Sequence, residues 1–187
     1  MFSLLLKTSY IVAVIFFNVF AHSSELHSSK EISDFRVKSL FLYNFANYVE
    51  WPDEAFQRPT SPIRMCLYGN LPFGGFLKSV DGTLIGQRRL DIMLTQERRD
   101  IVNGCQLLFV SEDRKEELPD FFDHLKFVYI LSVGDQAGFS DNGGVINILR
   151  TRDNFKFDIN ITNALQRGLF ISSELLSLAK EVKQLSN

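Results

Sequence analysis

The stretch that decides the fold is VKSLFLYNFANYVEWP, residues 37–52, in which apolar side chains outnumber polar ones. When the residues are placed at 100° steps, the apolar ones form one broad face, which predicts a helix whose apolar face is core. That face consists of Val37, Phe41, Leu42, Phe45, Ala46 and Val49. Ser33 or Asp34 is expected to cap the start of the helix. Pro52 is expected to end it, because proline has no backbone N–H.

Two features break this amphipathic pattern. Lys38 falls in the middle of the apolar face, whereas Leu40 and Tyr43 fall on the polar side. The stem of Lys38 can lie along apolar surface while its amine reaches water. Alternatively, the amine binds a ligand carboxylate or phosphate, or pairs with a buried acid such as Asp158. Core packing does not explain Leu40 and Tyr43, so both are expected in an interface with a partner or a second copy.

The first 23 residues are predicted to be a secretory signal peptide. Lys7 precedes an apolar run over residues 10–17, and small residues follow it. An uncleaved anchor is the alternative, but the run is short for a membrane span of about 20 residues. Residues 24–32 are a polar lead-in, and residues 33–187 are predicted to form a single domain. The exported protein is therefore expected to be soluble.

Composition limits the class of partner and the chemistry. The chain has 187 residues, 45% of them hydrophobic, and a formal net charge of −2. There is no basic excess, so nucleic acid is not expected as a partner. His22 and His27 lie in or near the signal, and His124 lies at a charged helix end. A metal site or a Ser-His-Asp triad has almost no residues to use, so neither enzyme activity nor a cofactor is expected.

Export bears on the oxidation state of the two cysteines, Cys66 and Cys105. An oxidising compartment permits a disulfide between them, and two buried free thiols are the alternative. A bridge closing a loop of this length would stabilise the fold by roughly 3–4 kcal/mol in the chain-entropy model.

The rest of the chain alternates predicted strands and helices. Strands are predicted at 63–68, 89–94, 106–110 and 127–133, helices within 71–80 and at 116–125, a hairpin at 145–149 and 155–159, and helices at 161–166 and from Ser172 or Ser173 through Val182. Continuous apolar strands alternating with helices predict an α/β layered fold, with a central mixed, mostly parallel sheet flanked by helices. Ligands of such sheets gather at the carboxyl ends of the strands.

The glycine-rich loop of residues 134–144 carries one aromatic residue that looks exposed, Phe139. Because loops often carry function, Phe139 is a candidate contact residue. The alternative is that the loop only leads into the hairpin.

These motifs, taken in order, resemble the YfiR-like family of periplasmic proteins. The resemblance rests on the opening pattern of residues 37–52, on Cys66 followed by Gly69, on Gly138-Phe139 before Gly143-Gly144, and on the ending from Phe157 to Ala179. It implies a periplasmic α/β protein that binds and represses the sensor domain of an inner-membrane diguanylate cyclase. It also implies that an outer-membrane lipoprotein can sequester the protein, that a homodimer can form, and that Cys66 and Cys105 are one of the family's two disulfides. The cysteines of the other disulfide are absent.

The hypothesis is therefore a non-enzymatic regulator of cyclic di-GMP signalling whose interface contains Leu40, Tyr43 and Phe139. The alternative is a small-molecule sensor working with a membrane histidine kinase, with its pocket near Lys38 and Asn160. A hydrolase would need a nucleophile–base pair that the sequence does not offer.

Overall fold

A computed structural model describes residues 33–70, 74–125, 128–152 and 154–184. The predicted signal peptide and the polar lead-in lie outside the described residues. Residues 38–187 form one compact unit, and residues 33–37, which belong to the preceding unit, are helical. The strands and the other helices belong to the larger unit.

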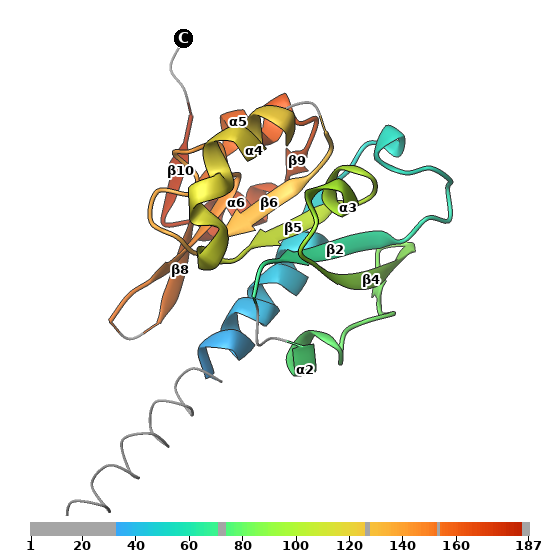
Figure 1. Cartoon of the computed structure of the whole chain (residues 1–187), viewed down its shortest axis with the longest axis horizontal. Helices are drawn as coiled ribbons and strands as arrows, with labels where there is room; N and C mark the ends of the chain where they lie inside the picture. Colours follow the sequence, from blue (N-terminus) through green and yellow to red (C-terminus); the bar gives the residue numbers. More distant parts are fainter. Residues whose placement is uncertain (1–32, 71–73, 126–127, 153, 185–187) are drawn as a thin grey trace, which may run out of the picture. The chain divides into compact units, whose positions relative to one another are not determined.

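An eight-stranded sheet is the centre of this unit (Figure 1). Its order is β10-β8-β7-β6-β5-β2-β4-β3. The strands are β2 (Ile63–Tyr68), β3 (Leu84–Ile85), β4 (Arg88–Thr95), β5 (Leu107–Val110), β6 (Leu131–Gly134), β7 (Ile146–Arg150), β8 (Phe155–Asn160) and β10 (Glu181–Lys183). Five neighbouring strands of the sheet are parallel to one another: β4, β2, β5, β6 and β7. β8 is antiparallel to β7, β10 is parallel to β8, and β3 is antiparallel to β4. The predicted fold class, a layered α/β fold with a mixed, mostly parallel sheet, is confirmed.

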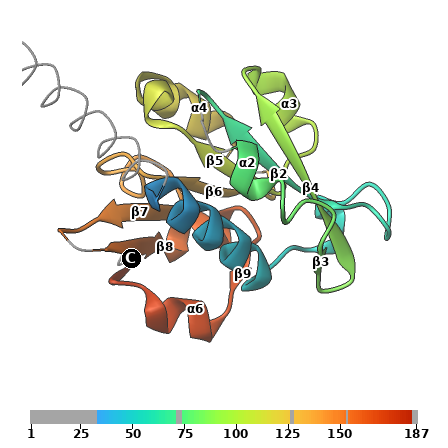
Figure 2. The same cartoon turned by 90° about the horizontal axis from the view of Figure 1, so that it is seen from below.

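The central strands are apolar on both faces because helices cover both sides of the sheet (Figure 2). In β5 all four residues are buried, and alternate ones point to opposite faces. Leu108 and Val110 belong to a core cluster with Ile101 of α3 (Arg98–Val102) and Phe121 of α4 (Leu118–Leu125). On the other face lies the helix that contains residues 38–47.

That helix covers the second face of the sheet through its predicted apolar side. Leu42, Phe45 and Ala46 are at most 1% exposed. The rings of Phe41 and Phe45 meet Phe157 of β8 edge-on, with centroid distances of 5.7 and 5.0 Å. Such aromatic pairs add to the burial of apolar area, so the apolar face fixes where the helix lies.

The helix ends earlier than predicted. It runs over residues 33–47 and does not continue to the turn before Pro52, and Val49–Glu50 form a strand, β1. The side chain of Asn47 donates to the carbonyl of Tyr43, which satisfies a carbonyl of the last turn. β1 then pairs antiparallel with β9 (Phe170–Ile171) to form a two-stranded ribbon. Pro52 follows this strand and does not end the helix.

The C-terminal part also departs from the prediction. After α5 (Ile161–Gln166) and β9, the last helix, α6, spans only Ser173–Leu178. The hydroxyl of Ser172 accepts from the N–H of Leu175, so Ser172 is the cap. Val182, which the apolar spacing placed in this helix, lies instead in β10, and β10 pairs with β8. The remaining elements are short: α2 (Gly74–Leu77) and the 3-10 turns η1 (Asp53–Ala55) and η2 (Glu112–Glu117).

Cys66 and Cys105 form a disulfide, with their Cα atoms 5.9 Å apart. Cys66 lies in β2, and Cys105 lies two residues before the neighbouring strand β5. The predicted bridge is therefore confirmed, and the alternative of two free thiols is wrong. It closes a separation of 39 residues, which corresponds to roughly 4 kcal/mol in the chain-entropy model.

Candidate partner-binding surface

Leu40 lies on the solvent side of the helix, as its place in the helical pattern predicts. Its side chain is 61% exposed, whereas Ser39 and Leu42 on the adjoining face are buried. Tyr43, one turn further on, is partly buried. Of the two helix residues placed in the interface from the sequence, Leu40 is thus open to a partner and Tyr43 only in part.

The β1–β9 ribbon presents a second exposed apolar pair that the sequence did not reveal. Val49 faces Ile171 and Glu50 faces Phe170, while the carbonyl of Tyr48 accepts from the N–H of Ser172. Side chains alternate along a strand, so Tyr48 and Phe170 share the side of the ribbon opposite the buried Val49. Tyr48 is 37% and Phe170 61% exposed.

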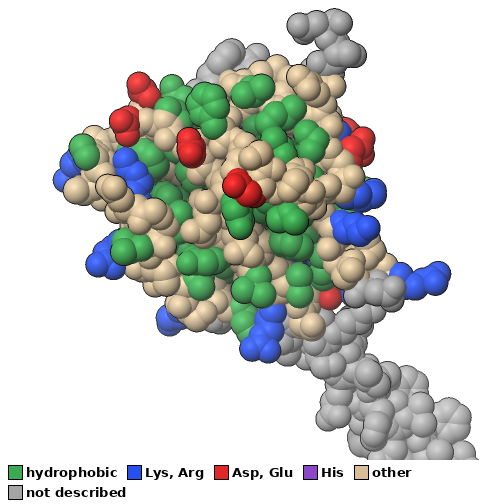
Figure 3. Space-filling model, turned by 180° about the vertical axis from the view of Figure 1, so that it is seen from behind, with side chains coloured by type: hydrophobic (Ala, Val, Ile, Leu, Met, Phe, Trp, Pro, Cys, Tyr) green, Lys and Arg blue, Asp and Glu red, His purple; other side chains and the backbone are tan. Residues whose placement is uncertain are grey.

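The helix, the ribbon and α6 lie on the same side of the sheet, opposite α3 and α4 (Figure 2). Leu178 at the end of α6 is 65% exposed. The space-filling view from this side shows hydrophobic side chains in several groups among a few charged ones (Figure 3). We call Leu40, Tyr48, Phe170 and Leu178 the apolar surface. Exposed apolar groups of this kind are typical of protein–protein contact sites.

Phe139 was predicted to be an exposed contact residue, and that prediction is wrong. Its side chain is 0% exposed. A Cβ at Gly134 or at Gly144 would overlap its ring, so the two glycines make room for it. The ring also meets Phe122 of α4 edge-on at 5.3 Å between centroids. The glycine-rich loop therefore folds its aromatic residue inward and closes over the core.

Arg167 fixes the same loop from the end of α5. Its guanidinium donates to the carbonyl of Gly143 at 2.6 Å and approaches the Ser132 hydroxyl at 3.4 Å. The residue is only 4% exposed, and burial lowers the pKa of its guanidinium to about 10. The group is still charged at neutral pH, so it acts as a fixed donor that holds the loop against β6.

Lys38 does not reach free solvent with its amine, nor does it pair with Asp158. The amine lies 2.5 Å from Oδ2 of Asp135, the residue that follows β6, and both side chains are largely buried. It also lies 5.8 Å from the centre of the Phe155 ring. Asp158 is instead buried in β8, where desolvation raises the pKa of its carboxyl. Lys38 therefore anchors the helix to the carboxyl end of β6.

The structure does not bring Lys38 and Asn160 together into a pocket. The Asn160 side chain caps α5 by accepting from the N–H of Asn163, and it donates to the carbonyl of Ser140. Its backbone N–H bonds to Val145, whose own N–H bonds to Ser132 near the start of β6. Asp135, the partner of Lys38, follows the other end of that strand. Lys38 and Asn160 therefore lie at opposite ends of β6 and stabilise different parts of the fold.

At the carboxyl ends of β2, β4 and β5, where ligands of such sheets usually bind, the loops form hydrogen bonds with one another. The carboxylate of Asp113 accepts from the N–H of Asn70 at 3.2 Å. Gln96 donates to the carbonyl of Gly69 at 2.8 Å. Within the described parts of the chain, no group of three or more histidines, cysteines or carboxylates is placed to hold a metal ion. The side chain of His124 lies outside the described residues.

These features define a small α/β protein with an exposed apolar surface. The family model DUF4154, described as YfiR/HmsC-like, matches residues 35–180. The chain therefore belongs to the YfiR/HmsC-like family. Members of this family are periplasmic regulators of cyclic di-GMP signalling rather than enzymes, and the family implies interaction with the sensor domain of a membrane diguanylate cyclase. None of the helices in the described residues is long and apolar enough to cross a membrane.

Two solved structures are similar to part of this chain. One is a conserved domain protein from Vibrio cholerae, with 11% identity and a TM-score of 0.49 over 65% of this chain and 55% of that one. The other is an ABC domain in complex with L-Trp from Streptococcus pneumoniae, with 10% identity and a TM-score of 0.47 over 66% and 56%. The matched part thus spans little more than half of each structure, and neither likeness bears on function. No curated protein matches the sequence.

Proposed function

We propose that this chain binds the periplasmic sensor domain of an inner-membrane diguanylate cyclase and represses the enzyme. The observation that carries the proposal is the apolar surface of a protein from a family of regulators. Leu40, Phe170 and Leu178 each expose more than half of their side chains on one side of the sheet. Burying such side chains against a partner stabilises a complex by about 25 cal/mol per Å² of apolar area, before the costs of association.

The mechanism is differential binding. The regulator shifts the sensor domain toward its inactive arrangement only to the extent that it binds that arrangement more tightly. An outer-membrane lipoprotein that binds the same apolar surface would then compete and restore cyclase activity. Export by the predicted signal peptide would bring the chain to the compartment in which both partners are exposed.

The test uses Leu40→Asp and Phe170→Asp in the full chain, because a carboxylate cannot be buried in an apolar contact without a large desolvation cost. Leu84→Asp is the matched control, since Leu84 is 59% exposed on β3 and is not part of the apolar surface. In cells that carry the cyclase and lack the native regulator, we expect the first two variants to leave cyclic di-GMP high and Leu84→Asp to lower it as the unaltered chain does.

Membranes from the same cells provide the second measurement. The unaltered chain and Leu84→Asp are expected to recover the cyclase, whereas Leu40→Asp and Phe170→Asp recover at least tenfold less. Unchanged cyclic di-GMP on deletion of the gene, together with no recovered cyclase, would overturn the proposal. Equal recovery by all four proteins would overturn the assignment of the surface.

A further inference from the structure

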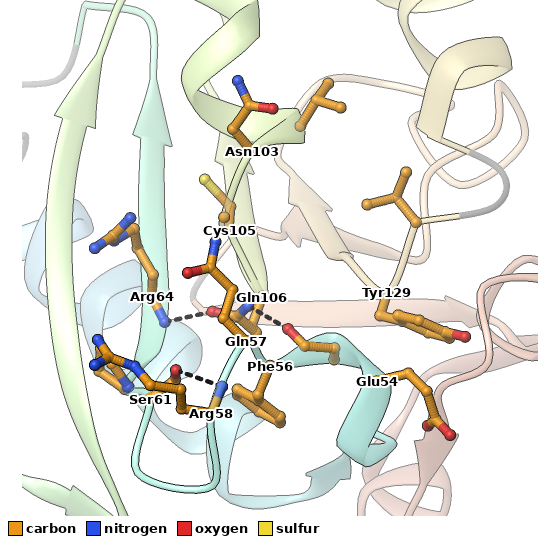
Figure 4. A pocket seen from close by; sticks show the side chains of 15 residues that line it. Glu54, Phe56, Gln57, Arg58, Ser61, Arg64, Asn103, Cys105, Gln106 and Tyr129 are labelled. Atoms are coloured by element: carbon orange, nitrogen blue, oxygen red, sulfur yellow. Dashed lines mark hydrogen bonds between the residues drawn. The ribbon is translucent and has the colours of Figure 1, made fainter.

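A pocket of about 360 Å³ lies at the amino ends of the central strands, and none of the apolar surface residues, nor Lys38 or Asn160, lines it. Its walls are the loop after β1, the start of β2, and the residues that precede β5 and β6. Figure 4 shows Arg58 and Arg64 on one side of it and Tyr129 on the other. This end of the sheet is opposite to the carboxyl ends of the strands, at which the sequence placed ligands.

The loop that forms one wall is held in place by Gln106, which also lines the pocket, and by Arg88. Gln106 is buried and donates to the carbonyl of Ala55 at 2.9 Å, while its Oε1 accepts from the N–H of Arg64 at 2.8 Å. Arg88 of β4 donates to the carbonyl of Ser61 at 2.9 Å and stacks on the Phe56 ring at 3.5 Å. The pocket is thus preformed, as ligand sites usually are.

One side of the pocket offers hydrogen-bond donors. Nε of Arg64 donates to Asp91 at 2.7 Å, which orients the guanidinium. Among the described residues, its two terminal nitrogens make no hydrogen bond, and neither does the guanidinium of Arg58. Gly104 permits this placement, since a Cβ there would lie 3.2 Å from Nη1 of Arg64. The side-chain amides of Gln57 and Asn103 also line the pocket.

The other side is apolar and aromatic. Tyr129 lies across from the two arginines (Figure 4), and Val102 and Val128 also line the pocket, whereas the ring of Phe56 stacks against Arg88. Glu54 also lines the pocket, but its carboxylate points away from the two arginines (Figure 4). The pocket therefore combines a cationic, donor-rich side with an apolar side.

From this arrangement we infer that the pocket binds a small organic anion, with its carboxylate or phosphate on Arg58 and Arg64 and its apolar part against Val102, Val128 and Tyr129. Guanidinium groups present several N–H donors in a plane that matches both anions. The apolar side excludes a bare inorganic ion as the best occupant, because such an ion would leave that surface without a contact. The inference does not depend on the proposed repression of a cyclase.

Titration calorimetry on the full folded chain tests it with chosen probes. Benzoate and phenyl phosphate represent the two anions, benzyl alcohol and benzylamine are neutral and cationic controls, and inorganic phosphate lacks the apolar part. We expect one or both aromatic anions to bind at least tenfold more tightly than benzyl alcohol, benzylamine and inorganic phosphate. Which aromatic anion binds more tightly identifies the headgroup.

Two variants locate the site. Arg58→Gln and Arg64→Gln should each weaken the favoured anion about tenfold, which corresponds to the loss of about 1.4 kcal/mol of binding free energy. The side chain of Arg58 makes no hydrogen bond in the described structure, so Arg58→Gln should leave the melting temperature unchanged. Arg152→Gln, in the exposed hairpin turn, is the matched control and should bind normally.

Three results would overturn the inference. One is the absence of saturable binding of either aromatic anion at millimolar concentration. The second is binding of benzyl alcohol or inorganic phosphate as tight as that of the aromatic anion. The third is binding that neither Arg58→Gln nor Arg64→Gln weakens.

Discussion

The glycine-rich loop and the first helix each carry a large apolar side chain that the sequence assigned to an interface. Phe139 in the loop is 0% exposed, and Leu40 on the helix is 61% exposed. On a helix, the spacing of residues fixes the direction of each side chain, so a leucine on the polar side must face away from the core. A loop has no such period, and its glycines let the backbone turn a phenylalanine inward. Exposure can be derived from sequence only where the backbone is regular.

The largest expected effect comes from removing the ring of the loop. Phe139→Ala should lower the free energy of unfolding by about 3–5 kcal/mol, because it leaves a cavity between Gly134, Gly144 and Phe122. Phe170→Ala is the matched control, since the same ring is removed from an exposed site, and it should cost less than about 1 kcal/mol. Urea unfolding followed by circular dichroism measures both. Equal losses would show that the two rings are not in different environments.

Gly144→Ala tests the packing around the Phe139 ring by adding a Cβ to the backbone beside it. The added Cβ would overlap the Phe139 ring, so the free energy of unfolding should fall by about 1–3 kcal/mol. The double variant Gly144→Ala with Phe139→Leu should lose less free energy of unfolding than the two single variants lose together, because the smaller side chain relieves the overlap. Additive losses in urea unfolding would contradict this packing.

Lys38→Met tests the buried end of the helix, in contrast with the exposed Leu40. It leaves the largely buried carboxylate of Asp135 without the amine, at an expected cost of about 1–2 kcal/mol. Asp135→Asn combined with Lys38→Met should recover part of the loss, since a neutral amide is cheaper to bury than a carboxylate. Thermal unfolding of these two variants and of the unaltered chain at neutral pH gives the comparison. A single variant as stable as the unaltered chain would mean that the pair contributes nothing.

The smallest effect on stability is expected at Leu40. Leu40→Ser should change the free energy of unfolding by less than about 0.5 kcal/mol, because the side chain is mostly in water in the free protein. A loss as large as that of Lys38→Met would place Leu40 in the core and remove it from the apolar surface.

The regular elements of the fold were predictable because their own residues specify them. The apolar run of residues 63–68 coincides with β2, and the hairpin strands are close to β7 and β8. The disulfide followed from export and from two neighbouring strands. β1, β9 and β10 could not be predicted, because strands of two or three residues have no periodicity and exist only through their partners. Their neglect also made the first and last helices too long.

The predicted site residues divide in the same way. The exposure of Leu40 followed from helical geometry, whereas the partner of Lys38 lies 97 residues away and depends on how β6 is placed. Phe170 was not predicted to be a surface residue, because a strand of two residues has no alternating pattern to show which side chains face solvent. The pocket at the amino ends of the strands was missed because its walls come from four segments that only the sheet brings together.

Trp51, the single tryptophan of the chain, connects the two regions proposed to bind other molecules. It directly follows β1, and its indole N–H donates to the carbonyl of Gln106 at 3.1 Å, beside the pocket. On the far wall, Tyr129 lies so close to Gly168 that a Cβ there would be 2.8 Å from its ring, two residues before Phe170. Trp51 is therefore an intrinsic fluorescence probe. Its emission should change when an anion binds in the pocket and also when a partner binds the ribbon, without any attached dye.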